Sequence, residues 1–242
     1  DEVLKNKRIK KIAVVYWDFI ALIDDEGKLY TYGKNEHGQI GDGTKEDKSS
    51  FVCISEMNGS CLNGKNIIDV YYNGYHPKGS MYAIDDSEKI YVWGNNDYGR
   101  LGMDTKEDIT SPICLNKNTG DILYGKNIKR ILPYSGNICL LDDNGKIYGL
   151  DYNYDNQKVE CISFNEKVEI LKDKCLIEIM IGGLIFDNEG NIYSPSGEND
   201  EITKVGLYEI NYNVAIYDQY IYSGIFVTNN SEVYYLIENV GT

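Results

Sequence analysis

The sequence predicts an all-β protein built from repeated antiparallel units, and the first reason is a long internal match. Residues 29–41 read LYTYGKNEHGQIG and residues 90–102 read IYVWGNNDYGRLG, so aromatic residues, asparagine and three glycines recur in register 61 residues apart. A match of this length and register indicates duplication of a folding unit. The fold can therefore be derived from its repeats.

A shorter signature raises the number of repeats to five. Each copy has an apolar residue, a turn rich in Asp or Asn, and then an apolar residue followed by tyrosine. The tyrosines that end the five copies are Tyr30, Tyr91, Tyr148, Tyr193 and Tyr234. Four intervals divide the 204 residues from the first to the last of them, so the mean period is 51 residues. This is the length of a β-propeller blade.

Local composition predicts strands in every repeat. Short runs rich in Ile, Val and Tyr alternate with Asp/Asn/Gly turns, which are typical of β-hairpins. The first unit divides into strands at residues 8–15, 19–24, 28–34 and 50–54. The five expected units cover approximately residues 6–54, 66–115, 126–162, 175–207, and 212–242 together with 1–5.

The two ends of the chain are expected to meet in the last blade. The fifth unit ends before an outer strand, whereas Glu2, Val3 and Leu4 precede the first unit as a spare segment. Filling the last blade with this segment would remove an exposed strand edge. The sequence thus predicts a single domain over residues 1–242, a β-propeller of about five four-stranded blades closed by an N-terminal strand.

The stretch Tyr-x-Trp/Tyr-Gly-x-Asn-x-x-Gly-x-Leu/Ile-Gly resembles the repeat of the regulator-of-chromosome-condensation propellers. The resemblance is specific over residues 9–115 and decays afterwards. The family usually has seven blades, so this chain is either a five-bladed ring or an open or truncated arc. The resemblance implies protein binding through loops, as in nucleotide-exchange factors for a small nuclear GTPase, in binding modules of larger proteins and in a secreted bacterial β-lactamase inhibitor. Fold alone does not choose among these roles.

Antiparallel meander topology separates two faces of such a propeller. One face carries the turns between second and third strands, where a ring of acidic residues is expected. Its members are Asp24, Asp25, Glu26, Asp85, Asp86, Glu88, Asp142, Asp143, Asp187 and Glu189. The other face carries the turns between inner and second strands, which are rich in Tyr and Trp, as interface hot spots are. The expected partner-binding residues are Tyr16, Trp17, Tyr72, Tyr75, His76, Tyr134, Tyr217 and Tyr220, although some of these aromatics would instead fill the central channel.

Charge narrows the range of partners. The chain has 38 acidic and 24 basic residues, which gives a formal net charge of −14 and a pI near 4.6. Phosphate backbones and anionic membranes attract clusters of Lys and Arg, so nucleic acid and membrane are not expected partners. We expect a monomer that binds another protein, with basic partners favoured.

Signals for an enzyme or a cofactor are weak. The chain has two histidines, His37 and His76, and it lacks the common nucleophile, metalloprotease and phosphate-loop motifs. Six cysteines show no Cys-x-x-Cys spacing, and Cys53, Cys114 and Cys161 recur in the expected outer strands, where they are interpreted as packing residues. We expect no catalytic residue, no metal and no cofactor. Free thiols favour a reducing compartment such as the cytoplasm, while the missing initiator Met leaves secretion open.

The resulting functional hypothesis is a protein-binding propeller, an inhibitor or sequestering protein that uses its aromatic face. Two alternatives stay open at this point. One is a guanine-nucleotide exchange factor for a small GTPase, and the other is a carbohydrate-binding module.

Overall fold

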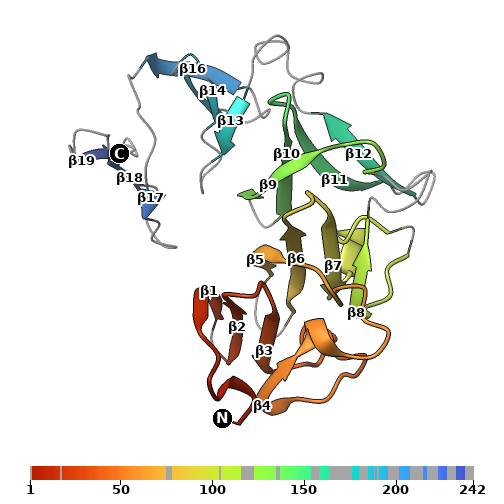
Figure 1. The fold of residues 1–242 in the computed structure, drawn as a ribbon. Coiled ribbons are helices and arrows are strands. Elements are labelled where there is room, and N and C mark those ends of the chain that lie inside the picture. The colour runs from red at the N-terminus through yellow and green to blue at the C-terminus, as the bar shows by residue number, and fades with distance from the viewer. Residues whose placement is uncertain are drawn as a thin grey trace.

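The computed structural model describes the backbone of most of the chain. The described residues are 2–16, 18–74, 78–103, 105–115, 123–134, 137–153, 158–163, 176–179, 185–187, 189, 191–195, 202–207, 215–216, 223–227 and 233–237. Side chains are described for most of residues 2–150. Short antiparallel sheets follow one another along the chain, which confirms the all-β fold predicted from the repeats (Figure 1).

Four sheets have four strands each, in the order in which the strands occur in the sequence. The first sheet contains β1 (Ile9–Tyr16), β2 (Phe19–Asp24), β3 (Leu29–Gly33) and β4 (Lys48–Cys53). The second contains β5 (Ile67–Asn73), β6 (Ser80–Asp85), β7 (Ile90–Gly94) and β8 (Ile109–Cys114). The third contains β9 (Ile128–Tyr134), β10 (Asn137–Asp142), β11 (Ile147–Asn153) and β12 (Lys158–Ser163). The fourth contains β13 (Leu176–Ile179), β14 (Ile185–Asp187), β15 (Asn191–Pro195) and β16 (Ile202–Leu207).

The fifth sheet has three described strands, β17 (Ala215–Ile216), β18 (Ser223–Val227) and β19 (Val233–Ile237). The described ranges also contain three short 3₁₀ helices. They are η1 (Glu2–Leu4), η2 (Ile54–Glu56) and η3 (Asp97–Gly99). No helix in the described ranges is long and apolar enough to cross a membrane.

The expected N-terminal closing strand is wrong, because Glu2–Leu4 forms η1. The chain turns immediately after it, since Lys5 N donates to Glu2 O, Lys7 N donates to Leu4 O, and Asn6 has a positive φ of 62°. The helix lies against β4 of its own sheet and does not pair with β19. Within the described residues, Glu2–Leu4 therefore adds no strand to the last sheet.

The acidic turns of the first three sheets are each organised by a buried pair of aspartate and tyrosine. In the first sheet Asp24 Oδ2 accepts a 2.8 Å hydrogen bond from Tyr30, and Oδ1 accepts from the backbone N–H groups of Glu26 and Lys28. The same arrangement recurs at Asp85 with Tyr91 and at Asp142 with Tyr148, at 2.8 and 3.0 Å. This geometry explains why the sequence signature ends in tyrosine.

These pairs show that the predicted ring of exposed acidic residues is wrong at three positions. Asp24, Asp85 and Asp142 are buried, so they cannot belong to a solvated rim. The residue that follows each of them, namely Asp25, Asp86 or Asp143, is exposed instead. The reason is that the first carboxyl of each turn caps backbone N–H groups and a tyrosine, which an exposed side chain could not do.

The cysteine pattern is confirmed in two sheets and wrong in the third. Cys53 lies opposite Tyr30 and Cys114 opposite Tyr91, so both hold one register position. Ser163 holds that position opposite Tyr148, because Cys161 pairs with Leu150. Burial raises the pKa of the Cys53 thiol, as expected for a packing residue.

The core lies between successive sheets. One cluster joins the first two sheets and includes Phe19, Ile23 and Trp93, and a second joins the second and third sheets and includes Tyr82, Ile84 and Ile131. The inner strand β1 also contacts β5, and the inner strand β9 contacts β6 and β13. This face-to-face packing of neighbouring sheets fixes the loops at their ends.

Candidate protein-binding face

The connections at one end of the first two sheets form a surface that we call the loop face. It comprises the β3–β4 loop at 34–47, the described part of the β7–β8 loop at 95–108, and the β5–β6 connection at 74 and 78–79. Lys34 N donates to Asp18 O at 3.1 Å, and Lys78 Nζ lies 2.7 Å from Asp97 Oδ2, so the inner turns and the long loops share one side. This is the arrangement expected from meander topology.

A buried asparagine organises each long loop from within. Asn35 Oδ1 accepts from Ile40 N at 2.8 Å, and its Nδ2 donates to the carbonyl oxygens of Thr44 and Glu46 at 3.0 Å. In the second loop Asn96 Oδ1 accepts from Leu101 N at 3.0 Å, and Nδ2 donates to the Thr105 carbonyl. The repeated asparagines therefore have a structural role in their loops.

The first long loop is also fastened to the second sheet. Trp93 is fully buried, and its Nε1 donates to the Gln39 carbonyl at 2.8 Å. Gly43 N donates to Thr110 O at 2.9 Å. Gly41 has a φ of 87° and lies so close to Trp93 that a Cβ there would be 2.9 Å from its Nε1. The loop is therefore held by the neighbouring sheet as well as by its own strands.

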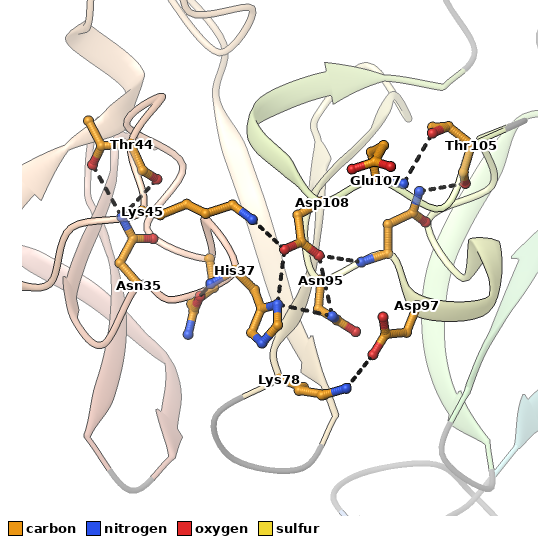
Figure 2. A network of polar contacts seen from close by, with 12 residues as sticks. Asn35, His37, Thr44, Lys45, Lys78, Asn95, Asp97, Thr105, Glu107 and Asp108 are labelled. Carbon is orange, nitrogen blue, oxygen red and sulfur yellow. Dashed lines mark hydrogen bonds and ion pairs between the residues drawn. The ribbon is translucent and has the colours of Figure 1, made fainter.

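Asp108 is the polar centre of this junction (Figure 2). Its Oδ2 lies 3.0 Å from His37 Nδ1 and 2.6 Å from Lys45 Nζ, both in the first loop, and its Oδ1 lies 3.3 Å from the backbone N of Asn96. Burial raises the pKa of Asp108, but the hydrogen bonds from Lys45 and His37 outweigh it and hold that pKa below its usual range. The carboxylate thus links the two loops at neutral pH.

Most charges of the loop face are paired, and three carboxylates are not. Lys34 pairs with Asp47 at 2.7 Å, Lys45 with Asp108, and Lys78 with Asp97. The exposed exceptions are Glu36, Glu46 and Glu107, which form no ion pair within the described residues. Two of them lie on the first loop and one on the second, so exposed carboxylates lie on both sides of the junction between the loops. Such a surface can receive cations of a partner.

The structure brings some predicted aromatic residues to this end of the sheets. Tyr16 ends β1 opposite Phe19, and Tyr134 ends β9 opposite Asn137, so both hold the last register position of an inner strand. Tyr72 is half-buried and packs on Phe19 with ring centroids 5.7 Å apart, which gives it a packing role. The remaining predicted residues, Trp17, Tyr75, His76, Tyr217 and Tyr220, lie outside the described residues.

Sequence reasoning missed Asp108, although a signal for it was present. Asp47 follows Asn35 by 12 residues, and Asp108 follows Asn96 by the same interval. Asp47 Oδ1 accepts from Asn35 N at 3.0 Å, as Asp108 Oδ1 does from Asn96 N. The repeated spacing therefore marks a loop-closing aspartate, while its extra contacts to the first loop depend on how the sheets pack. Among the described side chains, no group of three or more potential metal ligands is found.

Comparisons with known proteins agree with this architecture. Residues 26–76 and 87–128 match the regulator of chromosome condensation (RCC1) repeat. The human E3 ubiquitin-protein ligase HERC2 is 25% identical over 191 residues, which are 76% of this chain and 4% of HERC2. The Xenopus laevis serine/threonine-protein kinase Nek9 is 26% identical over 157 residues, which are 60% of this chain and 15% of Nek9. The chain thus spans a small part of each of these relatives.

A solved structure extends the similarity to the whole fold. Yeast RCC1 (Prp20), crystallised with Kap60 bound, superposes with a TM-score of 0.67 at 13% identity, covering 96% of this chain and 56% of that chain. A second structure of the same protein, Prp20p from Saccharomyces cerevisiae, is described together with its binding to Gsp1p and histones. The likeness supports a β-propeller fold.

Proposed function

Because the first two sheets of this chain are built from repeats of the RCC1 family, we propose that the chain is a protein-binding module whose loop face receives a basic segment of its partner. The resemblance to this family implies protein binding through loops, and yeast Prp20 is solved with Kap60 bound. These findings support a protein as the ligand. They do not identify the partner. The chemistry of the loop face indicates which kind of partner fits.

The observation that carries the proposal is the set of three unpaired carboxylates on a fastened pair of loops. Glu36, Glu46 and Glu107 are exposed, so a partner's Lys or Arg can reach them without displacing an existing ion pair. The loops beneath them are held by Asn35, Asn96 and Asp108, so binding would order little additional chain. Exposed charges of this kind favour fast, oriented association more than raw affinity.

Affinity would then come from the aromatic residues at the ends of the inner strands. Tyr and Trp supply large contact area and a polar tip, which suits the centre of an interface. The residues proposed for this role are Tyr16, Trp17, Tyr75, His76, Tyr134, Tyr217 and Tyr220. Tyr72 contributes the part of its ring that packing on Phe19 leaves exposed.

We propose an inhibitory or sequestering role for this module. HERC2 and Nek9 are named as enzymes, but this chain matches only 4% and 15% of their lengths. A module that occupies a partner's basic segment needs no chemistry beyond binding. Nucleotide-exchange activity would require release of nucleotide from a GTPase, which is directly measurable.

Two triple variants test the proposal at equal net charge. Glu36→Gln, Glu46→Gln and Glu107→Gln neutralise the loop face, whereas Asp25→Asn, Asp86→Asn and Asp143→Asn neutralise exposed turns elsewhere. Partners captured by the wild-type chain from extracts of its source organism would be identified by mass spectrometry and titrated against each variant at low and high salt. The proposal expects the loop-face variant to slow association and the turn variant to resemble wild type.

Other outcomes would contradict this assignment. Equally slowed association in both triple variants would mean that the net charge of the chain, and not the loop face, controls binding. Retained binding in the loop-face variant together with loss in Trp17→Ala would leave only the aromatic residues as the site. Release of labelled nucleotide from a captured GTPase would replace sequestration by exchange, and binding on a glycan array alone would replace a protein partner by carbohydrate.

A further inference from the structure

Four asparagines in the sequence precede a glycine, and the fold holds only some of them in place. They are Asn58, Asn63, Asn73 and Asn144. An Asn-Gly pair is chemically reactive because the glycine nitrogen, which no neighbouring side chain hinders, can attack the amide carbon of the asparagine side chain. In a folded protein the reaction depends on whether both groups are free to meet.

Two of the four pairs are held by hydrogen bonds or by a sheet. Asn144 Nδ2 donates to Asp143 Oδ1 at 2.9 Å, and Gly145 N donates to Asp142 O at 3.2 Å. Asn73 is the last residue of β5, inside the second sheet. The reacting groups of these pairs would have to leave their present contacts before they could meet.

Asn58 and Asn63 instead lie exposed in the segment that joins the first two sheets. Gly59 and Gly64, which follow them, have φ values of 79° and 72°, and a Cβ at either glycine would meet nothing within 4 Å. Among the residues that the structure describes, no hydrogen bond engages either asparagine side chain or the backbone N of either glycine. The reacting groups of both pairs are therefore free and open to water.

We propose that Asn58 and Asn63 are sites of spontaneous modification, at which the chain converts asparagine to aspartate and isoaspartate. The glycine N first forms a bond to Cγ of the asparagine, and the side-chain nitrogen leaves as ammonia with the glycine amide proton. Water then opens the resulting succinimide ring at one of its two carbonyl carbons. Opening at Cγ gives isoaspartate's counterpart aspartate, and opening at the backbone carbonyl gives isoaspartate, so the reaction consumes only water.

Modification of Asn63 affects a turn that lies next to the core. Leu62, the residue before it, is fully buried and belongs to the cluster that joins the first two sheets. Lys65 N donates to Leu62 O at 3.0 Å and closes the turn around Asn63. Isoaspartate lengthens the backbone by a carbon atom within this turn, and its carboxylate adds a negative charge. Modification at this position should therefore weaken the packing between the two sheets.

The segment between the second and third sheets provides a control variant. Tyr124 holds the position of Asn63 there, since Gly125 follows it with a φ of 75° and Lys126 N donates to Leu123 O at 3.0 Å. Tyr124 is 51% exposed, so a tyrosine side chain fits this kind of turn without burial. Asn63→Tyr should therefore fold and lose one of the two modification sites.

Peptide mapping by mass spectrometry during storage in mildly alkaline buffer tests the assignment. In the folded wild type, Asn58 and Asn63 should be modified about tenfold faster than Asn144 or more, because breaking a hydrogen bond first slows a reaction by about that factor. In urea all four Asn-Gly pairs should react at similar rates, which would show that the fold causes the difference. Equal rates at Asn63 and Asn144 in the folded chain would overturn the proposal. So would unmodified Asn58 and Asn63 in folded protein when the sample in urea reacts.

Thermal unfolding of aged protein tests the effect on the core. The melting temperature of the wild type should fall as isoaspartate accumulates at Asn63, and that of Asn63→Tyr stored in the same way should fall less. A wild type that is modified at Asn63 and still melts like fresh protein would contradict the effect on sheet packing.

Discussion

Replacing Asp85 by alanine tests whether the buried aspartate–tyrosine pairs hold the hairpins together. Asp85 is fully buried and accepts three hydrogen bonds, from Ser87 N and Lys89 N at 2.9 Å and from Tyr91 at 2.8 Å. Burial, strengthened by the hydrogen bond to Asp85, raises the pKa of Tyr91, so its hydroxyl stays protonated and donates across the physiological range. The alanine variant would leave the Tyr91 hydroxyl and two backbone N–H groups without their acceptor.

The expected loss can be built from these contacts. A buried donor left without a partner costs roughly 1–3 kcal/mol, and disrupting a buried polar network costs roughly 3–5 kcal/mol in total. For a domain of this size about 1 kcal/mol lowers the melting temperature by about 2–4 °C. Asp85→Ala should therefore melt roughly 6–20 °C below wild type. Tyr91→Phe removes only one of the three contacts and should lower stability by about 1–3 kcal/mol.

Thermal unfolding followed by circular dichroism would measure both variants and the double variant. The free energy of unfolding lost by the double variant should be smaller than the sum of the losses of the two single variants, because each side chain stabilises the fold partly through its bond to the other. Asp86→Ala is the control, since Asp86 is the exposed neighbour in the same turn and its loss should change stability by about 0.5 kcal/mol or less. Equal melting temperatures for Asp85→Ala and Asp86→Ala would refute a structural role for the buried pair.

Two further predictions concern the junction between the first two sheets. Asp108→Asn should lower stability by about 1–2 kcal/mol at neutral pH. Because the folded-state pKa of Asp108 is depressed, this difference should begin to shrink near the ordinary value of 3.8 and should be lost as the pH falls through the lower folded-state pKa. Denaturant unfolding at several pH values would measure it, and a difference that stays constant down to the lowest pH at which the protein folds would contradict the prediction. Gly41→Ala should destabilise the protein more than Gly59→Ala. Both glycines have a positive φ, but only a Cβ at position 41 meets Trp93, so the additional loss of about 1–3 kcal/mol measures the steric clash. Equal melting temperatures for the two variants would exclude such a clash.

The candidate site was only partly predictable. The asparagines of the long loops bond within their own loops, so the repeated motif already marked them as a local feature. Asp108 was missed because its main partners, His37 and Lys45, lie 71 and 63 residues away, on another sheet. Pairing over such distances depends on sheet packing, which no local pattern encodes. The unpaired state of Glu36, Glu46 and Glu107 became visible only once the ion pairs of their neighbours were known.

The sequence by itself determined the repeats, the antiparallel hairpins, the period of a propeller blade and the loop motif, because each of these rests on contacts made between residues close along the chain. Only the tertiary structure decided which carboxylates are buried, that Glu2–Leu4 turns into a short helix beside β4, and that Asp108 lies half-buried between two loops where its equivalent Asp47 is exposed. Equivalent residues in a repeat have the same local geometry, but their burial depends on whether another sheet covers them. That is a property of the assembled molecule, and no single repeat contains it.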